Sequence, residues 1–314
     1  MSAVTLGDIV AARERVGSLI RPTPVLRTEV PTPNGAVEVA FKLEYLQLGG
    51  SFKIRGSLNA ILHARELGTL SANGVIIASG GNAAIGAATA CRMLDLRCTV
   101  VVPTTAPTVK VERLDALGAD VHQIGDRFAL SAEAAAEIAE TAGALQLHAY
   151  DLPDIVAGAG TIGLEIREQL AEPLDVLVAV GGGGLVGGLT AALAPEHLIS
   201  GVEPTGAATL HQALAAGSPV PVELVSVAAD SLGATSLGAI CWDTISALPI
   251  RSLTVSDEEL ISAREFLWDE FRILVEHGTA AALAPLLSGA VVPEPGRLPC
   301  VVLCGANTTL KTGE

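Results

Sequence analysis

The stretch from Gly49 to Ala60, GGSFKIRGSLNA, places a lysine in unusual surroundings. Lys53 lies between Phe52 and Ile54, directly after two glycines and a serine. Removing a lysine from water lowers its pKa, and an unprotonated amine forms Schiff bases and acts as a base. The alternative is a lysine at the start of a helix with its charge in water. Because fully buried lysines are rare, this stretch alone favours the alternative.

A second group of candidate residues follows the apolar run 74–79. Ser79 ends the run, and Gly80, Gly81 and Asn82 lead into an alanine-rich stretch typical of a helix. In an open α/β sheet, ligands bind at the carboxyl ends of strands. Free N–H groups at a helix start bind anions, including a carboxylate. Asn82 adds a side-chain amide there, although an ordinary helix N-cap explains it equally well.

Four consecutive glycines, residues 181–184, follow another apolar strand and precede a helical stretch. Without Cβ atoms, such a loop lets the backbone approach a phosphate. The spacing of Gly182, Gly184 and Gly187 also satisfies G-x-G-x-x-G. Glu203 ends the next strand roughly 20 residues later, where a ribose-binding acid would lie. A nicotinamide dinucleotide site is therefore an alternative, and a turn that only packs a helix closely on a strand is another.

The last strand ends at Cys304, which is followed by Gly305, Ala306 and Asn307. A free cysteine is most often a small buried hydrophobe, and this stretch alone favours that interpretation. A cysteine also offers a weak, neutral S–H group to a ligand atom. Both interpretations stay open at this point.

The elements that must position these residues alternate along the chain. Apolar strands are predicted at 37–44, 74–79, 98–103, 120–125, 175–180, 198–203 and 299–305. Helices are predicted at 57–67, 83–94, 108–118, 130–143, 160–170, 257–271 and 278–289. Strands this apolar, with helices between them, indicate parallel sheets covered on both faces, an α/β fold. An amphipathic helix is predicted near the start, with Thr5 and Asp8 as a capping box.

Composition limits the classes of protein that fit. The 314 residues are 50% hydrophobic and carry a net charge of −15, without a basic cluster that would indicate a nucleic-acid partner. Five cysteines form no C-x-x-C pair, which argues against zinc and favours a reduced, cytoplasmic chain. The start lacks the apolar region of a signal peptide. Six glycines in the uncharged stretch 176–194 argue against a membrane span there.

Five motifs, taken in order, resemble one family. They are SFKIRG (51–56), SGGNAA (79–84), GGGGLVGG (181–188), GVEP (201–204) and LCGAN (303–307). They are similar to the pyridoxal-phosphate enzymes of the serine/threonine dehydratase group, which have the tryptophan synthase β-like fold (fold type II). The resemblance is nearest to serine dehydratases that carry a cysteine at the ring nitrogen. It runs from RPTPVL (21–26) to the last strand. An ordered set is far more specific than one motif, so Lys53 is expected to be the Schiff-base lysine.

The resemblance implies a role for each matching residue. Lys53 would bind the cofactor, pyridoxal 5'-phosphate, with Phe52 beside its ring. Asn82 would bond the ring hydroxyl, Cys304 would face the ring nitrogen, and Glu276 would lie near the ring. The residues that cradle the cofactor phosphate would be Gly181, Gly182, Gly183, Gly184 and Leu185. The loop that holds the substrate carboxylate would be Ser79, Gly80, Gly81, Asn82 and Ala83.

The resemblance also implies an organisation and a reaction. Two domains are expected, each an open, twisted, mostly parallel sheet covered by helices. The large cofactor-binding domain would be 1–66 plus 149–314, the small domain 67–148, and the protein a homodimer. The implied reaction is elimination of water from L-serine, L-threonine or a related β-hydroxy amino acid, giving a 2-oxo acid and ammonia. Alternatives are a racemase or β-replacement enzyme on the same fold, an NAD-dependent dehydrogenase, and a non-catalytic binding protein.

Two departures from the family pattern change what is expected. Many relatives have Ser-Ser-Gly-Asn-His where this chain has SGGNA (79–83), which leaves a roomier pocket. Similar racemases use the second of those serines as an acid–base group, and Gly80 has no side chain to do so. Relatives with a divalent metal use a Glu, a carbonyl and an Asp, whose counterparts here are Glu203, Ala207 and Thr209. The missing carboxylate predicts no Mg²⁺ or Mn²⁺ site, since hard cations bind charged oxygens.

Overall fold

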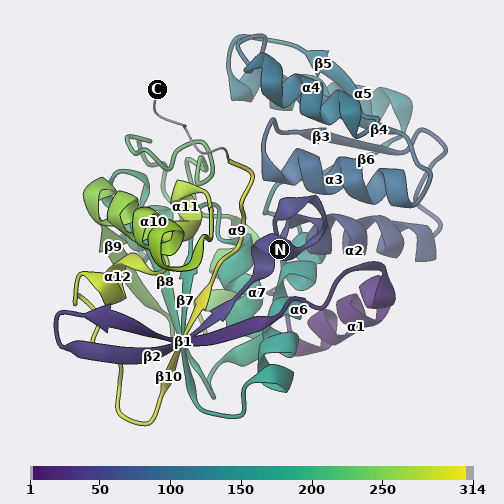
Figure 1. The fold of residues 1–314 in the computed structure, drawn as a ribbon. Coiled ribbons are helices and arrows are strands. Elements are labelled where there is room, and N and C mark those ends of the chain that lie inside the picture. The colour runs from purple at the N-terminus through teal and green to yellow at the C-terminus, as the bar shows by residue number, and fades with distance from the viewer. Residues whose placement is uncertain (1–2, 309–314) are drawn as a thin grey trace.

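A computed structural model describes residues 3–308, which form two sheets with helices around them (Figure 1). The larger sheet has the order β1-β2-β10-β7-β8-β9, and the smaller sheet has the order β5-β4-β3-β6. Only β1 and β2 pair antiparallel; every other pairing in the two sheets is parallel. The α/β class with two mostly parallel sheets is therefore confirmed. The strands are β1 (Val25–Thr32), β2 (Gly35–Lys42), β3 (Val75–Ala78), β4 (Cys98–Val102), β5 (Asp120–Gln123), β6 (Leu145–Leu147), β7 (Leu174–Ala179), β8 (Leu198–Pro204), β9 (Arg251–Val255) and β10 (Leu298–Val302).

Most of the helices lie where the sequence places them. The first begins after Thr5, whose hydroxyl accepts from the Asp8 N–H, so the capping box is confirmed. None of the helices within residues 3–308 combines the length and the apolar character that a membrane span requires. The helices are α1 (Leu6–Val16), α2 (Lys53–Glu66), α3 (Asn82–Met93), α4 (Thr108–Ala116), α5 (Phe128–Ala142), α6 (Pro153–Gln169), α7 (Gly184–Leu193), α8 (Thr209–Ala216), α9 (Ala239–Ile245), α10 (Asp257–Phe271), α11 (His277–Ala280) and α12 (Ala284–Leu287).

Several predicted elements need correction. The single helix expected at 278–289 is two short helices, α11 and α12, with Pro285 near the start of the second. Proline lacks an N–H and clashes with the carbonyl four residues earlier, so one continuous helix is disfavoured there. Helices α2 and α6 begin earlier than predicted, at Lys53 and Pro153. Strands β1, β6 and β9 were not predicted, and all three lie at sheet edges.

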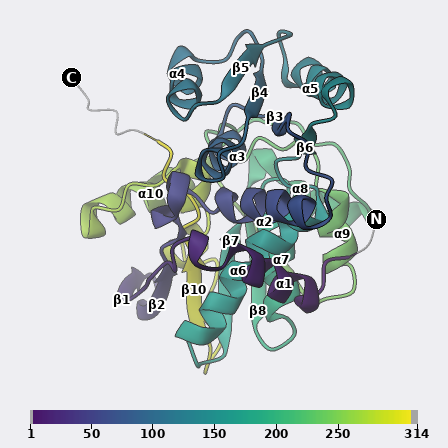
Figure 2. The same cartoon turned by 90° about the vertical axis from the view of Figure 1, so that its right-hand side faces the viewer.

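Helix α2 lies between the two sheets in both views (Figures 1 and 2). Its Ile54, Leu58 and Ile61 belong to the same apolar cluster as the side chains of β3 and α3. On its other side it packs against α6 at unusually short range, because a Cβ at Gly158 would lie 2.6 Å from the Gly56 Cα. The four strands of the smaller sheet fall within 67–148. The domain boundaries themselves stay a prediction, and residues 1–2 and 309–314 of the expected large domain lie outside the described residues.

Two strand ends converge on the start of α2. Strands β7 and β10 are parallel neighbours, so the glycine loop after β7 and Cys304 after β10 lie at the same edge of the larger sheet. The Phe52 N–H donates to the Cys304 carbonyl over 3.0 Å, and Ser51 pairs with Gly305 as an isolated bridge. Lys53 is thereby placed beside the end of the last strand, at the edge where α/β sheets bind ligands.

Candidate active site

Lys53 is the first residue of α2 and is half-buried, and it lines a pocket. Its Nζ donates to the Ala149 carbonyl over 2.8 Å and lies 4.9 Å from the centre of the Phe52 ring. Burial lowers the pKa of Lys53 from 10.5 to about 8, against the opposing effect of Cys304 and Glu276. The amine is therefore much closer to losing its proton at neutral pH than a surface lysine. The helix-start interpretation is right about position, but the charge is not left in water.

One pocket brings together most of the predicted site residues. Its lining includes Phe52, Lys53, Asn82, Gly181, Gly182, Gly183, Gly184, Leu185, Glu276 and Cys304. These residues come from α2, α3, the loop after β7 and the segments that flank α11 and follow β10. Of the predicted carboxylate-binding loop, only Asn82 is part of the lining; Ser79, Gly80, Gly81 and Ala83 are not.

The glycine loop is held close to other backbone and ring atoms. A Cβ at Gly182 would lie 2.3 Å from the Tyr150 ring, and Gly183 has a φ of +88°, so both positions require glycine. The Gly182 carbonyl accepts from the Gly238 N–H over 3.0 Å. Helix α7 begins at Gly184, and the N–H groups of its first turn have no intrahelical partner. This end of the pocket therefore suits an anion such as a phosphate.

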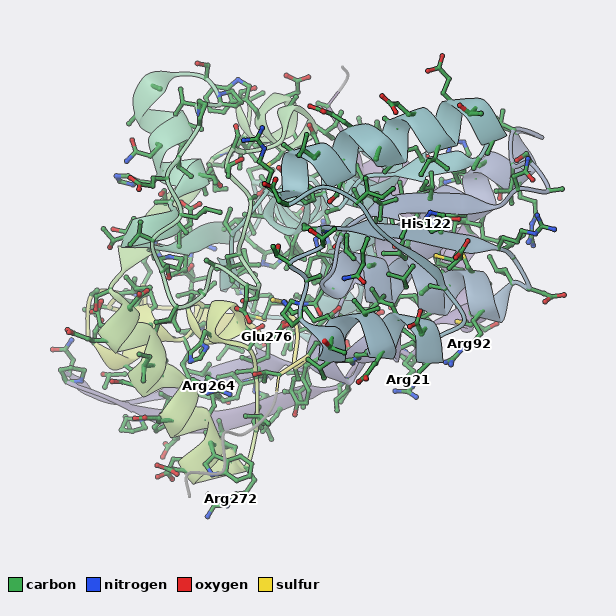
Figure 3. All side chains as sticks on the ribbon, turned by 90° about the horizontal axis from the view of Figure 1, so that it is seen from above. Arg21, Arg92, His122, Arg264, Arg272 and Glu276 are labelled. Carbon is green, nitrogen blue, oxygen red and sulfur yellow. The ribbon has the colours of Figure 1, made fainter. Side chains whose placement is uncertain are left out.

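Asn82 and Glu276 face each other inside the pocket. The Asn82 Nδ2 donates to both carboxylate oxygens of Glu276, over 2.9 and 2.8 Å. Burial raises the pKa of Glu276 to about 7, although the bond from Asn82 opposes this. Figure 3 shows Glu276 in the interior, between the half that carries Arg264 and the half that carries Arg92. The carboxyl group can therefore exist in either protonation state near neutral pH.

Cys304 is buried in the wall of the pocket. Its Sγ lies 3.3 Å from the Thr279 hydroxyl, which itself donates to the Gly305 carbonyl over 2.9 Å. Since the hydroxyl proton is used in that bond, the thiol is the donor to Thr279. Burial raises the pKa of Cys304 to about 11, so the group is a neutral thiol at pH 7.

The loop between β3 and α3 bonds to itself. The Gly81 N–H donates to the Ser79 hydroxyl over 3.2 Å, which turns that side chain back over its own loop. Helix α3 begins at Asn82, and the N–H groups of its first turn have no intrahelical partner. These N–H groups, rather than that of Gly81, are the donors that remain for a carboxylate.

Glu203 does not face the pocket. Its oxygens accept from the N–H groups of Leu210 and His211 over 2.8 and 2.9 Å, and from the Thr209 hydroxyl over 3.2 Å. Its carboxylate thus caps the start of α8 and is not available to bind a ribose. The single proton of the Thr209 hydroxyl is shared between Glu203 and the Gly181 carbonyl, which ties the glycine loop to α8. The nicotinamide alternative loses its acidic residue.

Several residues of the pocket lining are not indicated by the sequence motifs: Tyr150, Ala179, Val186, Ser231, Leu232 and Thr279. Ala179 and Val186 flank the predicted glycine loop. Tyr150 follows the end of β6, so the strand-end rule would have indicated it had that edge strand been recognised. Ser231 accepts from the Gly278 N–H over 3.2 Å and lies in a segment without helix or strand. No periodic pattern marks Ser231 or Leu232.

Pyridoxal phosphate fits this set of groups. Its aldehyde suits an amine whose pKa is near neutrality, and its phosphate suits the free N–H groups at the start of α7. Its ring hydroxyl suits the amide of Asn82. Its ring nitrogen suits the neutral thiol of Cys304, whose S–H can exchange its bond to Thr279 for one to that nitrogen. The donor set thus supplies a partner for each polar end of the cofactor.

Comparisons with known proteins agree with this fit. Residues 16–305 match the family model described as "Pyridoxal-phosphate dependent enzyme". The chain is 33% identical to L-threonine ammonia-lyase of Thermotoga maritima, over 97% of this chain and 76% of that protein. It is 31% identical to serine racemase of Arabidopsis thaliana, over 98% of this chain and 94% of that protein. A crystal structure of threonine deaminase from T.th. superposes with a TM-score of 0.88 at 33% identity, covering 98% of this chain and 99% of that one.

These matches span nearly the whole of both sheets. They decide between the two cofactors that the glycine loop left open. The chain belongs to the family of pyridoxal-phosphate dependent enzymes.

Proposed function

We propose that this enzyme eliminates water from L-serine, L-threonine or a related β-hydroxy amino acid, and that hydrolysis of the product gives a 2-oxo acid and ammonia. The observation that carries the proposal is the pocket itself. An amine with a pKa of about 8 and a neutral thiol share it with the glycine loop 181–184. The named lyase relatives, L-threonine ammonia-lyase and threonine deaminase, support the same reaction class.

Lys53 is the proposed catalytic base. Bound pyridoxal phosphate supplies an electron-withdrawing ring that acidifies the Cα–H of the substrate. Lys53 Nζ takes that proton, since it lies in the pocket wall and its pKa is already lowered toward neutrality. The Cβ–O bond then breaks, and the β-hydroxyl leaves as water with the proton that Lys53 Nζ took from Cα. The released enamine adds a water and gives the 2-oxo acid and ammonia. The Ala149 carbonyl, 2.8 Å from Nζ, holds the amine in place between these steps.

The remaining groups of the pocket would hold and orient the cofactor and the substrate. The first-turn N–H groups of α7 would hold the cofactor phosphate, and those of α3 would hold the substrate carboxylate. Asn82 and Glu276 would lie along the edge of the ring. Cys304, as a neutral thiol, would not force a proton onto the ring nitrogen, as a carboxylate partner would. This arrangement would favour rapid loss of the β-hydroxyl, because negative charge would not be held for long on the cofactor ring.

The second candidate function is a racemase, favoured by the 31% identity to a serine racemase. Racemisation requires a second acid–base group on the face of the substrate opposite Lys53. Gly80 has no side chain, and the Ser79 hydroxyl is bonded to the Gly81 N–H. Lys53 alone returns a proton only to the face from which it came. The loop therefore supports the lyase over the racemase.

Three further features are proposed together with the reaction. The small domain would comprise 67–148 and the large domain the rest of the chain. The protein would be a homodimer of the cytoplasm and would need no divalent metal. The support for the dimer is the family resemblance, and the support for the domain limits is that the smaller sheet lies within 75–147.

The test is a panel of amino acids scored for 2-oxo acid. The purified protein should absorb in the violet, and borohydride should attach the cofactor covalently to Lys53. L-Serine, L-threonine or a β-hydroxy relative should yield 2-oxo acid and ammonia in equal amounts. A substrate that yields D-isomer at or above the amount of 2-oxo acid would make the enzyme a racemase and leave the cofactor assignment standing.

A further inference from the structure

Asn307 joins three segments at the edge of the pocket, although it lies outside the pocket lining. Its Oδ1 accepts from the guanidinium of Arg113, which comes from α4. Its Nδ2 donates to the Gly49 carbonyl over 2.9 Å and also to the Asn82 Oδ1. The carboxamide fits closely against Gly50, where a Cβ would lie 2.6 Å from the Asn307 Oδ1. The oxygen and the nitrogen of this amide are therefore both engaged.

The contacts of Asn307 determine which way Asn82 faces. The Asn82 Oδ1 accepts from Asn307, so its Nδ2 must point the other way, into the pocket toward Glu276. Turning the Asn82 amide over would place its Oδ1 against both carboxylate oxygens of Glu276. It would also place two N–H₂ groups together at Asn307, and neither contact is then a hydrogen bond.

Glu276 alone does not guarantee this direction. Burial raises the pKa of Glu276 to about 7, so a large fraction of its carboxyl is protonated near neutral pH. A protonated carboxyl donates as well as accepts, and it then tolerates either face of the Asn82 amide. Asn307 has no titratable group and keeps its two donors at every pH. Of the two partners of Asn82, Asn307 is therefore the one whose hydrogen bonding does not change with pH.

We propose that Asn307 is a positioning residue that fixes the Asn82 amide with its N–H₂ group toward the cofactor ring, and that Arg113 holds Asn307 in place from α4. This inference rests on the proposed place of Asn82 beside the cofactor. The link runs from a helix of the smaller sheet, through the segment after β10, to the first residue of α3.

The main test variant is Asn307→Asp. It keeps the size of the side chain beside Gly50 but replaces both donors with an acceptor that opposes the Asn82 Oδ1. It also strengthens the contact with Arg113, so a loss of function cannot come from a weaker link to α4. Binding of pyridoxal phosphate to cofactor-free protein should weaken about tenfold, and the visible absorbance and circular dichroism of the holoenzyme should change. Asn307→Ser serves as the second variant if the aspartate protein does not fold.

A double-mutant cycle separates positioning from general damage. Asn82→Ala should weaken cofactor binding by itself, and adding Asn307→Asp to it should weaken binding no further. Asn73→Asp is the matched control, because Asn73 is an exposed amide of the same chemistry whose Nδ2 bonds to the Ala142 carbonyl over 2.6 Å, away from the pocket. Arg113→Met should weaken binding less than Asn307→Asp, and its effect should vanish when Asn307 is already replaced.

Three results of these binding measurements would overturn the inference. Wild-type cofactor affinity in Asn307→Asp, together with a loss in Asn82→Ala, overturns the positioning role and leaves the site assignment intact. Losses that add in the double variant show that Asn307 acts without Asn82, and they overturn the role as well. Unchanged affinity in Asn82→Ala overturns the place of Asn82 beside the cofactor and, with it, this inference.

Discussion

Lys53 and Arg55 lie two residues apart on α2, and each belongs to a cluster of buried ionisable groups. The two clusters differ in whether each cation is paired with a carboxylate. The Arg55 cluster consists of Arg55, Glu44, Glu165 and Lys42. Arg55 donates to both oxygens of Glu44 over 2.8 and 3.1 Å and lies 2.7 Å from Glu165. Lys42 donates to Glu165 over 2.6 Å. Two cations face two carboxylates, and all but Glu165, whose side chain is 14% exposed, are wholly buried.

The Lys53 pocket lacks such pairing. Within residues 3–308 no carboxylate lies within ion-pair distance of Lys53, whose amine bonds to a carbonyl instead. Burial therefore moves the pKa of Lys53 down to about 8 and that of Glu276 up to about 7. In the Arg55 cluster, burial alone would raise the pKa of Glu165, but Arg55 and Lys42 lower it below its usual value. Pairing keeps charges fixed, whereas its absence leaves groups able to exchange protons near neutral pH.

The largest effect should come from removing the unpaired amine. Lys53→Ala should reduce turnover about 1000-fold or more, because a positioned base contributes on that scale. The midpoint of urea unfolding of the cofactor-free protein should stay near that of the wild type, since no ion pair is lost. The 2-oxo acid assay and a urea titration check the two halves. Arg92→Ala, which removes an exposed cation from α3, is the control. Equal turnover in Lys53→Ala and wild type would remove Lys53 from the mechanism.

Breaking the Arg55 cluster should have the opposite result, a large loss of stability and a small loss of turnover. Arg55→Met leaves the buried Glu44 carboxylate without its cation, which should lower the free energy of unfolding by about 3–5 kcal/mol. Turnover per folded molecule should fall much less than in Lys53→Ala. Arg27→Ala is the control, because Arg27 forms exposed ion pairs with Glu38 and Glu172 whose loss water tolerates. Unfolding at the wild-type urea concentration in Arg55→Met would show that the cluster does not stabilise the fold.

The pH dependence of stability should separate the carboxylates of the two clusters. The folded pKa of Glu276 is raised, so the folded state binds more protons between pH 4.5 and about 7. The contribution of Glu276 is fully present below pH 4.5 and is lost as the pH rises through 7. Its full size corresponds to roughly 3 kcal/mol.

The comparison between wild type and Glu276→Gln isolates this contribution, because Glu203 titrates over the same range in both proteins. Urea unfolding of the cofactor-free proteins should show the wild type losing stability relative to the variant from pH 5 to 7. Glu165→Gln should show the reverse sign, since the folded pKa of Glu165 is lowered and its stability is lost as the pH falls below 4.5. Parallel pH curves for wild type and Glu276→Gln would contradict the raised pKa.

A smaller effect is expected from adding the missing acid–base group to the loop. A Cβ at Gly80 would have only the Val102 Cγ1 as a near neighbour, at 3.5 Å, and Gly80 is not among the glycines with positive φ. Gly80→Ser should therefore fold and should raise the fraction of substrate that is racemised. Gly81→Ser is the matched control, because it adds the same group one residue further along, where no atom lies within 4 Å of the new Cβ. Chiral chromatography beside the 2-oxo acid assay measures both products. A D-isomer fraction that is equal in the two variants would count against the role of position 80.

The interior strands are all predicted from the sequence, and the strands that it misses all lie at sheet edges, although one further edge strand, β5, is also predicted. Every interior strand was found, because β2, β3, β4, β7, β8 and β10 are apolar runs. The missed strands β1, β6 and β9 are edges; β1 includes exposed residues such as Leu26 and Arg27 and carries Pro31. Edge strands need neither continuous apolarity nor a full set of N–H donors.

The candidate site divides in the same way. Lys53, the glycine loop and Cys304 stand at the ends of interior strands or in local motifs, and the ordered set of five motifs, rather than any one stretch, indicates their chemistry. Tyr150 follows an edge strand, and Asn307 acquires its meaning only from contacts with Arg113, Gly49 and Asn82. Those partners are far away in sequence, and the contacts depend on how two sheets pack around α2. No local pattern carries that information.

Glu203 is a third kind of buried carboxylate and gives the smallest expected effect. It has neither a cation, as in the Arg55 cluster, nor a place in the Lys53 pocket; two N–H groups of α8 satisfy it. Burial raises its pKa to about 7, against those N–H bonds, so at neutral pH it is a poorer ligand than an ionised carboxylate. Thr209, at the position where the family resemblance implies a carboxylate in enzymes that bind a divalent metal, adds no charge. Hard divalent cations need charged oxygens, so EDTA should leave turnover unchanged in the 2-oxo acid assay. Complete loss of turnover with EDTA, restored by Mg²⁺, would mean that Glu203 binds a metal ion instead of the N–H groups of α8 and takes part in the reaction.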